Sequence, residues 1–444
     1  MNHILGIDFG TTKSTIGIWK DNKPFIIPTQ SSKLSIPSEL LVQIKGEESQ
    51  VFAGWESQNK NKYSNDSYIV KAIKRMAGDS NLNNEKWWYK HPQYAYSYIF
   101  SELKLLAEDY LNQEISDVVI TIPIHFDLNQ RRYILEAAKI ARLNVLRLLN
   151  EPTASAIAYT QYDSKNQTIM VIDVGGGTTD IAIIDFEENV YEVKYVDGKT
   201  NVGGVDYNRK LYEWLLTQIN KTYGIEKSQV NKLAEVILFD EIERVKKELS
   251  ENKSSKIYLP WLSINDSFLK NEFIITQPKF ASLTEDITSE IINMSHKALK
   301  EFDKNIDTFL LMGSAGKTFG LKERLKKQLG ISTIRRIQLE TSVAIGAITQ
   351  AAAFNGNHNC LVLDRTQDSY GIEINDKKYE IFIEKNKPIP TYCIKEFTTS
   401  VNYQEAILIN VYKGNHSSCI YNSYVGKLEI YDIPPALKGT LKIL

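Results

Sequence analysis

Two segments of this 444-residue chain carry the same arrangement of residues that can bind phosphate. Each one, 4–19 (ILGIDFGTTKSTIGIW) and 169–184 (IMVIDVGGGTTDIAII), has an apolar run, an aspartate, a turn of glycine and threonine, and a second apolar run. Glycine lets backbone N–H groups approach a phosphate closely, and threonine hydroxyls add donors. Asp8 and Asp173 end the first apolar runs, where a carboxylate is costly unless a cation lies nearby. The pattern predicts two turns that hold one polyphosphate together with a hydrated Mg²⁺ ion, which takes few protein ligands.

The repetition itself predicts the domain organisation. The two aspartates are 165 residues apart, and each stands between two strand-like runs. A duplicated α/β domain with one hairpin in each half explains this spacing. Two unrelated hairpins are the alternative, which is disfavoured because Asp, Gly and Thr follow in the same order both times.

Other common phosphate motifs do not occur in the sequence. It contains neither GxxxxGK[ST] nor a strand-linked GxGxxG. Gly203 and Gly204, in DGKTNVGGVDYN, form a candidate third phosphate contact, although such a pair is by itself more often an ordinary turn.

Alternating strands and helices would position these turns. VVITIPIHF (118–126) predicts a buried strand, and helical spacing of apolar residues follows in 129–143. Further helices are expected at 150–159, 209–219, 239–250 and 341–354, and a further strand at 308–313. From Cys360 onward strand-like runs predominate. We therefore predict an α/β domain over 1–356, a linker over 357–364 and an all-β segment over 365–444.

Composition narrows the function classes. Lys and Arg number 53 and Asp and Glu 54, so a net charge of -1 offers no global field to attract nucleic acid or anionic membrane. The sequence contains no run of about 18 apolar residues, which a membrane-spanning helix would need, and its N-terminus does not have the pattern of a leader peptide. The three cysteines, Cys360, Cys393 and Cys419, match no metal motif and are expected to be reduced thiols of a cytoplasmic protein.

The ordered motifs resemble one known family. GIDFGTTKS, VVITIPIHF, NEPTASAIAY, IDVGGGTTD and VGGVDYN, with KAIKRMAGD and the later YGIEI, NKPIPT and YDIPPALKGT, resemble the DnaK-type heat-shock chaperones of the actin-like ATPase superfamily. The resemblance covers most of the chain. It implies a two-lobed, actin-like ATPase domain that binds ATP or ADP with Mg²⁺ and hydrolyses ATP slowly. It also implies a peptide-binding β-sandwich for unfolded or extended segments, and as partners a J-domain co-chaperone and a nucleotide-exchange factor.

The resemblance also assigns roles to individual residues. Those with catalytic roles are Lys74, Glu151, Asp173, Thr178 and Asp180, and those near the water shell of Mg²⁺ are Asp8 and Asp173. Nucleotide contacts are implied for Gly10, Thr11, Thr12, Lys13, Gly175, Gly176, Gly177, Thr178, Gly203, Gly204, Glu243, Lys246, Lys247, Ser250, Gly313, Ser314, Lys317 and Glu340. Coupling between domains or to co-chaperones is implied for Pro123, Arg131, Arg147 and Asp364. Without the family resemblance, Lys74 would be interpreted as a solvated lysine on a helix. The arginine and aspartate among the coupling positions would likewise be interpreted as ordinary solvated surface residues.

The chain departs from the family on the adenosine side. Lys247 and Lys317 stand where the family has arginine, and Ser314 stands at the second glycine of its Gly-Gly-Ser-Thr-Arg segment. A guanidinium stacks on a base better than an ammonium does. We therefore expect weaker adenosine binding than is usual in the family, with the phosphate site intact.

The all-β segment is shorter than the family's β domain, and no helical lid follows it within the 444 residues. Two functions stay open: an ATP-driven chaperone for many extended polypeptides, or a nucleotide-dependent regulatory protein that binds one specific partner. A small-molecule kinase or a filament-forming actin relative would share the hairpins but not the motif order or the all-β segment, and is disfavoured.

Overall fold

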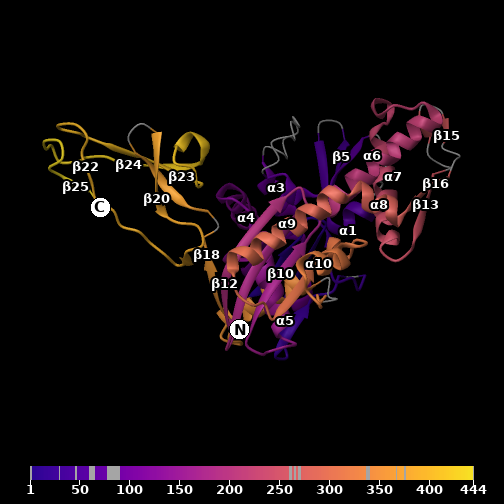
Figure 1. The fold of residues 1–444 in the computed structure, drawn as a ribbon, viewed down its shortest axis with the longest axis horizontal. Helices are drawn as coiled ribbons and strands as arrows, with labels where there is room; N and C mark the ends of the chain where they lie inside the picture. The colour runs from indigo at the N-terminus through magenta and orange to yellow at the C-terminus, as the bar shows by residue number, and fades with distance from the viewer. Residues whose placement is uncertain are drawn as a thin grey trace. The chain divides into compact units, whose positions relative to one another are not determined.

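The computed structural model describes residues 3–29, 31–45, 48–59, 66–77, 91–259, 263–264, 267–268, 272–336, 341–366, 368–374 and 377–443. The chain divides into two compact units. The first unit is Met1–Tyr191 with Asp197–Leu361, and the second unit is Glu192–Val196 with Val362–Leu444. Figure 1 shows the elements of both. Within the described ranges, no helix combines the length and the apolar character that a membrane span requires.

The first lobe of the first unit is built on a sheet in the order β3-β2-β1-β8-β9, with β4 also paired to β2. Its strands are β1 (Leu5–Phe9), β2 (Lys13–Lys20), β3 (Lys23–Ile26), β4 (Ile36–Pro37), β8 (Asp117–Ile122) and β9 (Asn144–Asn150). β1 pairs antiparallel with β2, so that Asp8 lies opposite Thr15, and parallel with β8. The predicted hairpin therefore has a parallel strand beside its first strand.

The second lobe repeats this arrangement. Its strands β17 (Thr308–Met312), β10 (Gln167–Val174), β11 (Thr178–Glu187) and β12 (Val190–Thr200) follow one another in that order in the sheet. β10 pairs antiparallel with β11, which places Asp173 opposite Asp180, and parallel with β17. The predicted duplicated α/β fold is confirmed by this match between the two sheets.

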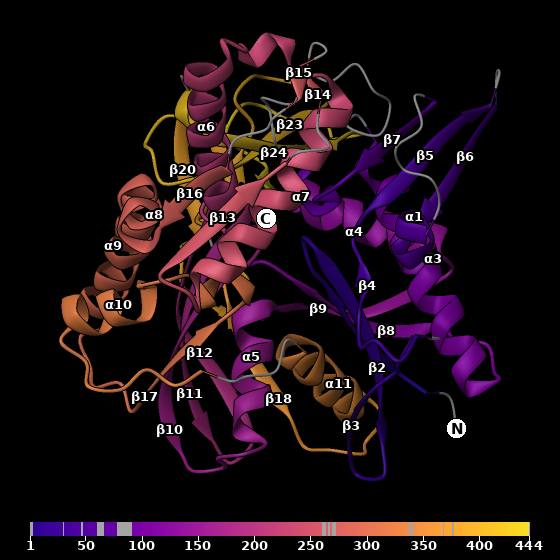
Figure 2. The same ribbon diagram turned by 90° about the vertical axis from the view of Figure 1, so that its right-hand side faces the viewer.

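Two helices join the lobes. α5 (Glu151–Thr160) packs on β10 and β11, α11 (Ser342–Phe354) packs on β1 and β2, and the two helices pack on each other, as Figure 2 shows. A Cβ on Gly346 would lie 1.9 Å from the Ala154 carbonyl oxygen, and one on Gly6 would lie 2.3 Å from the Ile348 nitrogen. Glycine is thus required where α11 meets its neighbours.

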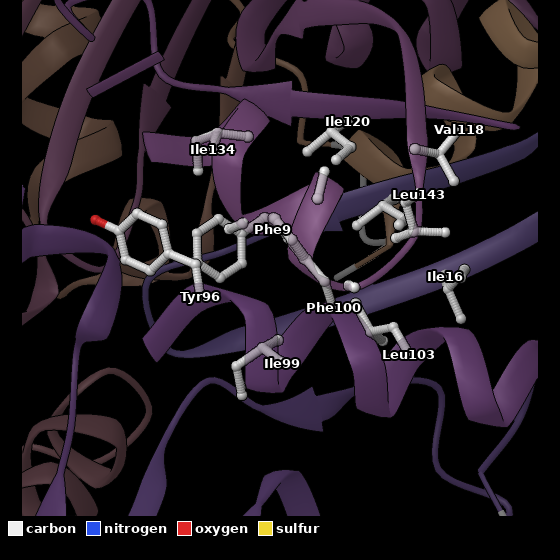
Figure 3. Close-up of a cluster of buried hydrophobic side chains, with 14 of the residues drawn as sticks. Phe9, Ile16, Tyr96, Ile99, Phe100, Leu103, Val118, Ile120, Ile134 and Leu143 are labelled. Atoms are coloured by element: carbon white, nitrogen blue, oxygen red, sulfur yellow. The ribbon is translucent and has the colours of Figure 1, made fainter. Parts of the chain in front are cut away.

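A cluster of buried hydrophobic side chains packs around Phe9 of β1 (Figure 3). The Phe9 ring meets the rings of Tyr96 and Phe100 edge-on, with centroids 5.1 and 5.0 Å apart. Both partners belong to α3 (Pro92–Leu111), and α4 (Leu128–Ile140) packs beside that helix. Asp127 caps α4 by accepting from the Gln130 backbone N–H at 2.9 Å. The packing of Phe9 on α3 therefore fixes the position of β1, the strand that ends at the first turn.

Smaller elements extend each lobe. The first lobe adds a sheet of β5 (Leu40–Lys45), β6 (Glu48–Ala53) and β7 (Ser67–Val70), with α1 (Gly54–Asn59) and the 3₁₀ turn η1 (Ile73–Arg75). The second lobe adds α6 (Gly204–Tyr223), η2 (Lys227–Gln229), α7 (Lys232–Leu249), β13 (Ser254–Tyr258), β14 (Ser263–Ile264), β15 (Ser267–Phe268), β16 (Glu272–Thr276), α8 (Gln277–Leu283), α9 (Glu285–Phe302), η3 (Ser314–Lys317) and α10 (Leu321–Leu329). Tyr212 of α6 stacks on Phe239 of α7 with centroids 4.5 Å apart. This contact packs α7 against α6.

The second unit consists of short strands. Its main sheet has the order β20-β19-β23-β24. The strands are β18 (Leu361–Arg365), β19 (Tyr370–Ile374), β20 (Lys378–Ile383), β21 (Pro388–Ile389), β22 (Phe397–Thr398), β23 (Ile407–Lys413), β24 (Ser423–Ile430) and β25 (Lys442–Ile443), with the turn η5 (Cys419–Tyr421). The Arg365 guanidinium donates to the Val193 carbonyl at 2.5 Å and to Glu192 at 3.1 Å, which ties the two parts of this unit together. The first residues of β18 fall in the range predicted as a linker.

Candidate active site

The two glycine and threonine turns lie against each other. A Cβ on Gly176 would be 3.1 Å from the Thr12 methyl group and 3.3 Å from the Thr11 Cβ. Gly10 is equally confined, because a Cβ there would lie 2.2 Å from the Lys13 carbonyl oxygen. Turns from residues far apart in the sequence thus meet and form one glycine-lined surface.

The carboxylates beside these turns form one electrostatic cluster. Burial, together with the Glu151 charge, raises the pKa of Asp8 to about 7, although Lys74 and a 3.1 Å hydrogen bond from Thr121 oppose the rise. Burial also raises the pKa of Asp173, and the charges of Glu151, Asp180 and Asp8 add to that rise. These side chains repel one another in a region that water reaches poorly. A cation beside them would offset this repulsion.

Lys74 supplies positive charge to this cluster. Its ammonium pairs with Glu151, and its side chain is only 3% exposed. Burial raises the pKa of Glu151, and Lys74 opposes that rise. The ammonium lies 5.6 Å from the ring centroids of both Phe9 and Phe126, and the Tyr96 hydroxyl donates to the Lys74 carbonyl at 3.1 Å. Lys74 is therefore a buried lysine aimed at the carboxylates.

Gly203 and Gly204 pack against the second glycine and threonine turn, residues 175–178. A Cβ on Gly203 would lie 2.7 Å from the Thr178 nitrogen. The Gly204 N–H donates to the Gly175 carbonyl at 3.0 Å, and the next residue's N–H donates to the Gly176 carbonyl at 2.7 Å. The Gly203 N–H donates to Asp206 at 3.0 Å, which caps α6. This glycine pair is thus part of the same surface as the second hairpin.

Helix α7 and turn η3 border the glycine pair. A Cβ on Gly204 would lie 3.4 Å from the Lys246 ammonium and 3.5 Å from the Ala315 Cβ. Lys246 donates to Glu243 at 2.7 Å and to the Gly204 carbonyl at 3.1 Å. Burial would raise the pKa of Glu243, but Lys246 and an Asn208 hydrogen bond outweigh it and lower that pKa. The helix positions expected to face a nucleoside therefore lie next to the glycine surface.

The remaining predicted contacts lie in the same region. Ser250 donates to the Lys246 carbonyl at 3.3 Å, and the Lys247 ammonium lies 3.2 Å from Glu243 while its side chain is 69% exposed. Gly313 has a φ of 75°, and a Cβ on it would lie 2.5 Å from the nearer Asp173 carboxylate oxygen, so η3 also touches the second hairpin. Ser314, Lys317, Thr12 and Lys13 are exposed. Glu340 lies outside the described residues.

An Hsp70 protein family model matches residues 4–91 and 79–444 of this chain. This chain belongs to the Hsp70 family. Hsp70 proteins are chaperones and are generally ATPases that bind ATP and ADP, substrate peptides and co-chaperones. The glycine surface and the carboxylate cluster occupy the positions that the Hsp70 resemblance assigned to phosphate and metal.

The residues present fit a magnesium nucleotide. Within the described ranges, no group of three or more His, Cys, Asp and Glu side chains could hold a metal ion directly. Mg²⁺ commonly keeps its water shell and shares it between phosphates and one or two carboxylates. The raised pKa values of Asp8 and Asp173 show that the carboxylate cluster lacks compensating positive charge, which a magnesium ion with its water shell would supply.

The residues to which the resemblance assigned coupling between domains or to co-chaperones are not part of the glycine surface or the carboxylate cluster. Pro123 is buried after β8, and Arg131 of α4 donates to the Phe126 carbonyl at 3.0 Å. Arg147 is half-buried on β9, and Asp364 pairs with Ile389 in the second unit. The first unit thus connects Pro123 and Arg131 with the Lys74 cluster through Phe126, whereas Asp364 belongs to the other unit.

Arg75 and His125 lie in the site and were not predicted. Arg75 packs over Gly177, where a Cβ would lie 2.7 Å from its Cδ, and pairs with Asn201 and Asp206. His125 hydrogen-bonds Asp180 at 3.1 Å. Two features of the sequence could have indicated these residues: Arg75 directly follows Lys74, and His125 is a histidine within the buried-strand motif VVITIPIHF.

Proposed function

We propose that this chain is an Hsp70-type chaperone that binds ATP with Mg²⁺ between its two hairpins, hydrolyses it, and thereby controls its hold on extended polypeptide. The observation that carries the proposal is the convergence of both glycine turns with the Asp8, Glu151, Asp173 and Asp180 carboxylates and the buried Lys74.

Binding of phosphate is the role of the turns. Backbone N–H groups of 10–12 and 176–177 would donate to phosphate oxygens, and the Thr11, Thr12 and Thr178 hydroxyls would add donors. Asp8 and Asp173 would accept hydrogen bonds from the water molecules that surround a bound Mg²⁺ ion. Bound Mg²⁺ supplies neutralisation of phosphate charge.

Hydrolysis in this proposal is in-line attack of water on the γ-phosphorus. The bond from the water oxygen to phosphorus forms as the bond to the oxygen bridging to ADP breaks, and the water's proton ends on the released phosphate. Lys74 offsets the negative charge on the transferred group. Glu151 and Asp180 orient the water, so catalysis rests on positioning and charge neutralisation.

The second unit supports a polypeptide-binding role. Several large apolar side chains are exposed there, and an extended polypeptide that packs on them would remove this apolar surface from water. They include Tyr392 at 85%, Tyr421 at 73%, Ile394 at 68%, Ile420 at 66% and Tyr403 at 63% exposure. An extended peptide with apolar residues is the matching ligand class.

Hydrolysis is tested by single-turnover conversion of ATP to ADP with and without Mg²⁺. Lys74→Ala should lower the rate by about a hundredfold or more, because it removes the charge facing the phosphate. Lys327→Ala, on the exposed side of α10, is the matched control and should retain the wild-type rate. Equal rates in wild type and Lys74→Ala would refute the proposed site.

Polypeptide control is tested with a panel of unrelated extended peptides. Peptides rich in large apolar residues should each stimulate hydrolysis and should bind more tightly with ADP than with ATP. Stimulation by one protein and by none of the peptides would instead support a partner-specific regulatory protein.

A further inference from the structure

His125 is fixed against Asp180 just after β8. The His125 Nδ1 atom lies 3.1 Å from the Asp180 Oδ1 atom, and the Ile124 N–H donates to the same oxygen at 3.1 Å. The backbone of Gly198 covers the pair, since a Cβ there would lie 2.5 Å from that oxygen and 3.3 Å from the Nδ1 atom. Asp180 is 1% exposed. The imidazole therefore has little freedom to turn.

This contact decides the state of the other ring nitrogen. A carboxylate accepts hydrogen bonds, so the Nδ1 atom carries the proton and the Nε2 atom of the neutral ring is an acceptor. The Nε2 atom is buried and has no hydrogen-bond partner among the described residues. Buried polar atoms are seldom left unpaired. The Nε2 atom therefore needs a donor that arrives with a ligand or with water.

The ring lies beside the hydrolytic cluster. Glu151 lies within electrostatic range of His125. The imidazole meets the Phe126 ring edge-on with centroids 5.6 Å apart, and the Lys74 ammonium lies 5.6 Å from that same ring. His125 thus shares its surroundings with the side chains assigned to water and γ-phosphate.

We propose that His125 is a water-positioning residue for ATP hydrolysis. Asp180 holds the ring through the Nδ1 atom, and the Nε2 atom accepts a hydrogen bond from the water that attacks the γ-phosphorus. This inference rests on the proposed ATPase function. It gives Asp180 a specific task, which is to keep the imidazole in the orientation and tautomer that present the Nε2 acceptor.

Two substitutions separate the ring nitrogens. His125→Asn places an amide near the Nδ1 position, so the contact with Asp180 is kept and the Nε2 acceptor is lost. His125→Gln reaches the Nε2 position instead. In single-turnover assays with ATP and Mg²⁺, His125→Asn should slow hydrolysis by about tenfold or more, and His125→Gln should be clearly faster than His125→Ala. His296→Asn, an exposed histidine on α9, is the matched control and should leave the rate unchanged.

Two readouts besides activity accompany the rates. ADP affinity in the presence of Mg²⁺, measured by calorimetry, should change less than about twofold in His125→Asn, since water-positioning does not contribute to ADP binding. The melting temperature without nucleotide should fall by only a few degrees, because the Nε2 atom makes no hydrogen bond in the described structure that could be lost and only the packing of the ring on Phe126 is removed.

The outcomes are distinct. A wild-type rate in His125→Asn, while Lys74→Ala is inactive, overturns this inference alone. A parallel loss of ADP affinity and melting temperature in His125→Asn overturns it too, because the residue would then be merely structural. If the wild type and Lys74→Ala both fail to hydrolyse ATP, the proposed function falls and this inference falls with it. Should His125→Asn not fold, equal rates for His125→Gln and His125→Ala overturn the inference, and a faster His125→Gln supports it.

Discussion

Lys74 illustrates how a residue's role depends on surroundings that its own segment does not encode. In IKRMAGD a lysine is normally solvated, yet Phe9 of β1 and Phe126 after β8 enclose its ammonium. Asp8 and Asp173 could be proposed from the sequence because a repeated motif marks them. Arg75 and His125 could not, since their partners Asp206 and Asp180 are more than 50 residues away along the chain.

The departures at Lys247 and Lys317 yield a prediction at this scale. Lys247→Arg combined with Lys317→Arg should tighten ADP binding by roughly two- to fivefold per residue, because each guanidinium adds about 0.5–1 kcal/mol of stacking on the base. Calorimetric titration of ADP with Mg²⁺ measures the change. Lys253→Arg, exposed beyond the end of α7, is the control and should have no effect. Unchanged affinity in the double variant would show that these lysines do not face the base.

At the scale of elements, the strands were easier to predict than the helix starts. The hairpins β1–β2 and β10–β11 follow directly from the repeated pattern. α6 begins at Gly204 rather than at 209, and α7 at Lys232 rather than at 239. Gly-Val-Asp-Tyr-Asn has weak helix propensity, but the Asp206 cap on the Gly203 N–H stabilises that first turn. Asn231 caps α7 with its own side chain, which accepts from the Ala234 N–H at 2.8 Å.

An ion pair between elements of the two lobes predicts an effect on nucleotide release. Lys71, just before η1, lies 2.6 Å from Asp240 of α7, and both side chains are about 40% exposed. Lys71→Ala should speed ADP release by up to about fivefold at low salt, because an exposed pair contributes about 0–1 kcal/mol.

Stopped-flow release of a fluorescent ADP analogue measures this effect, which should fade in high salt as the charges are screened. The exchanged pair Lys71→Asp with Asp240→Lys should restore slow release. A release rate that neither single nor double substitution alters would show that the pair does not restrain the lobes.

At the scale of the whole molecule, duplication was predictable and the lobe extensions were not. One repeated motif defines both central sheets, whereas β5–β7 and β13–β16 carry no chemical motif and form through packing on their own lobes. The all-β texture after residue 360 indicated a separate segment. The sheet order β20-β19-β23-β24 could not be derived, because short strands of similar composition can pair in several orders.

The central claim is that both hairpins bind one magnesium nucleotide, and the dependence of ADP affinity on Mg²⁺ tests it most directly. Calorimetry should find one ADP per chain and an affinity that rises by roughly tenfold or more with Mg²⁺. Asp8→Asn and Asp173→Asn, one in each hairpin, should each abolish that rise, while Asp21→Asn in the β2–β3 turn should keep it. Full Mg²⁺ dependence in either hairpin variant would contradict the account.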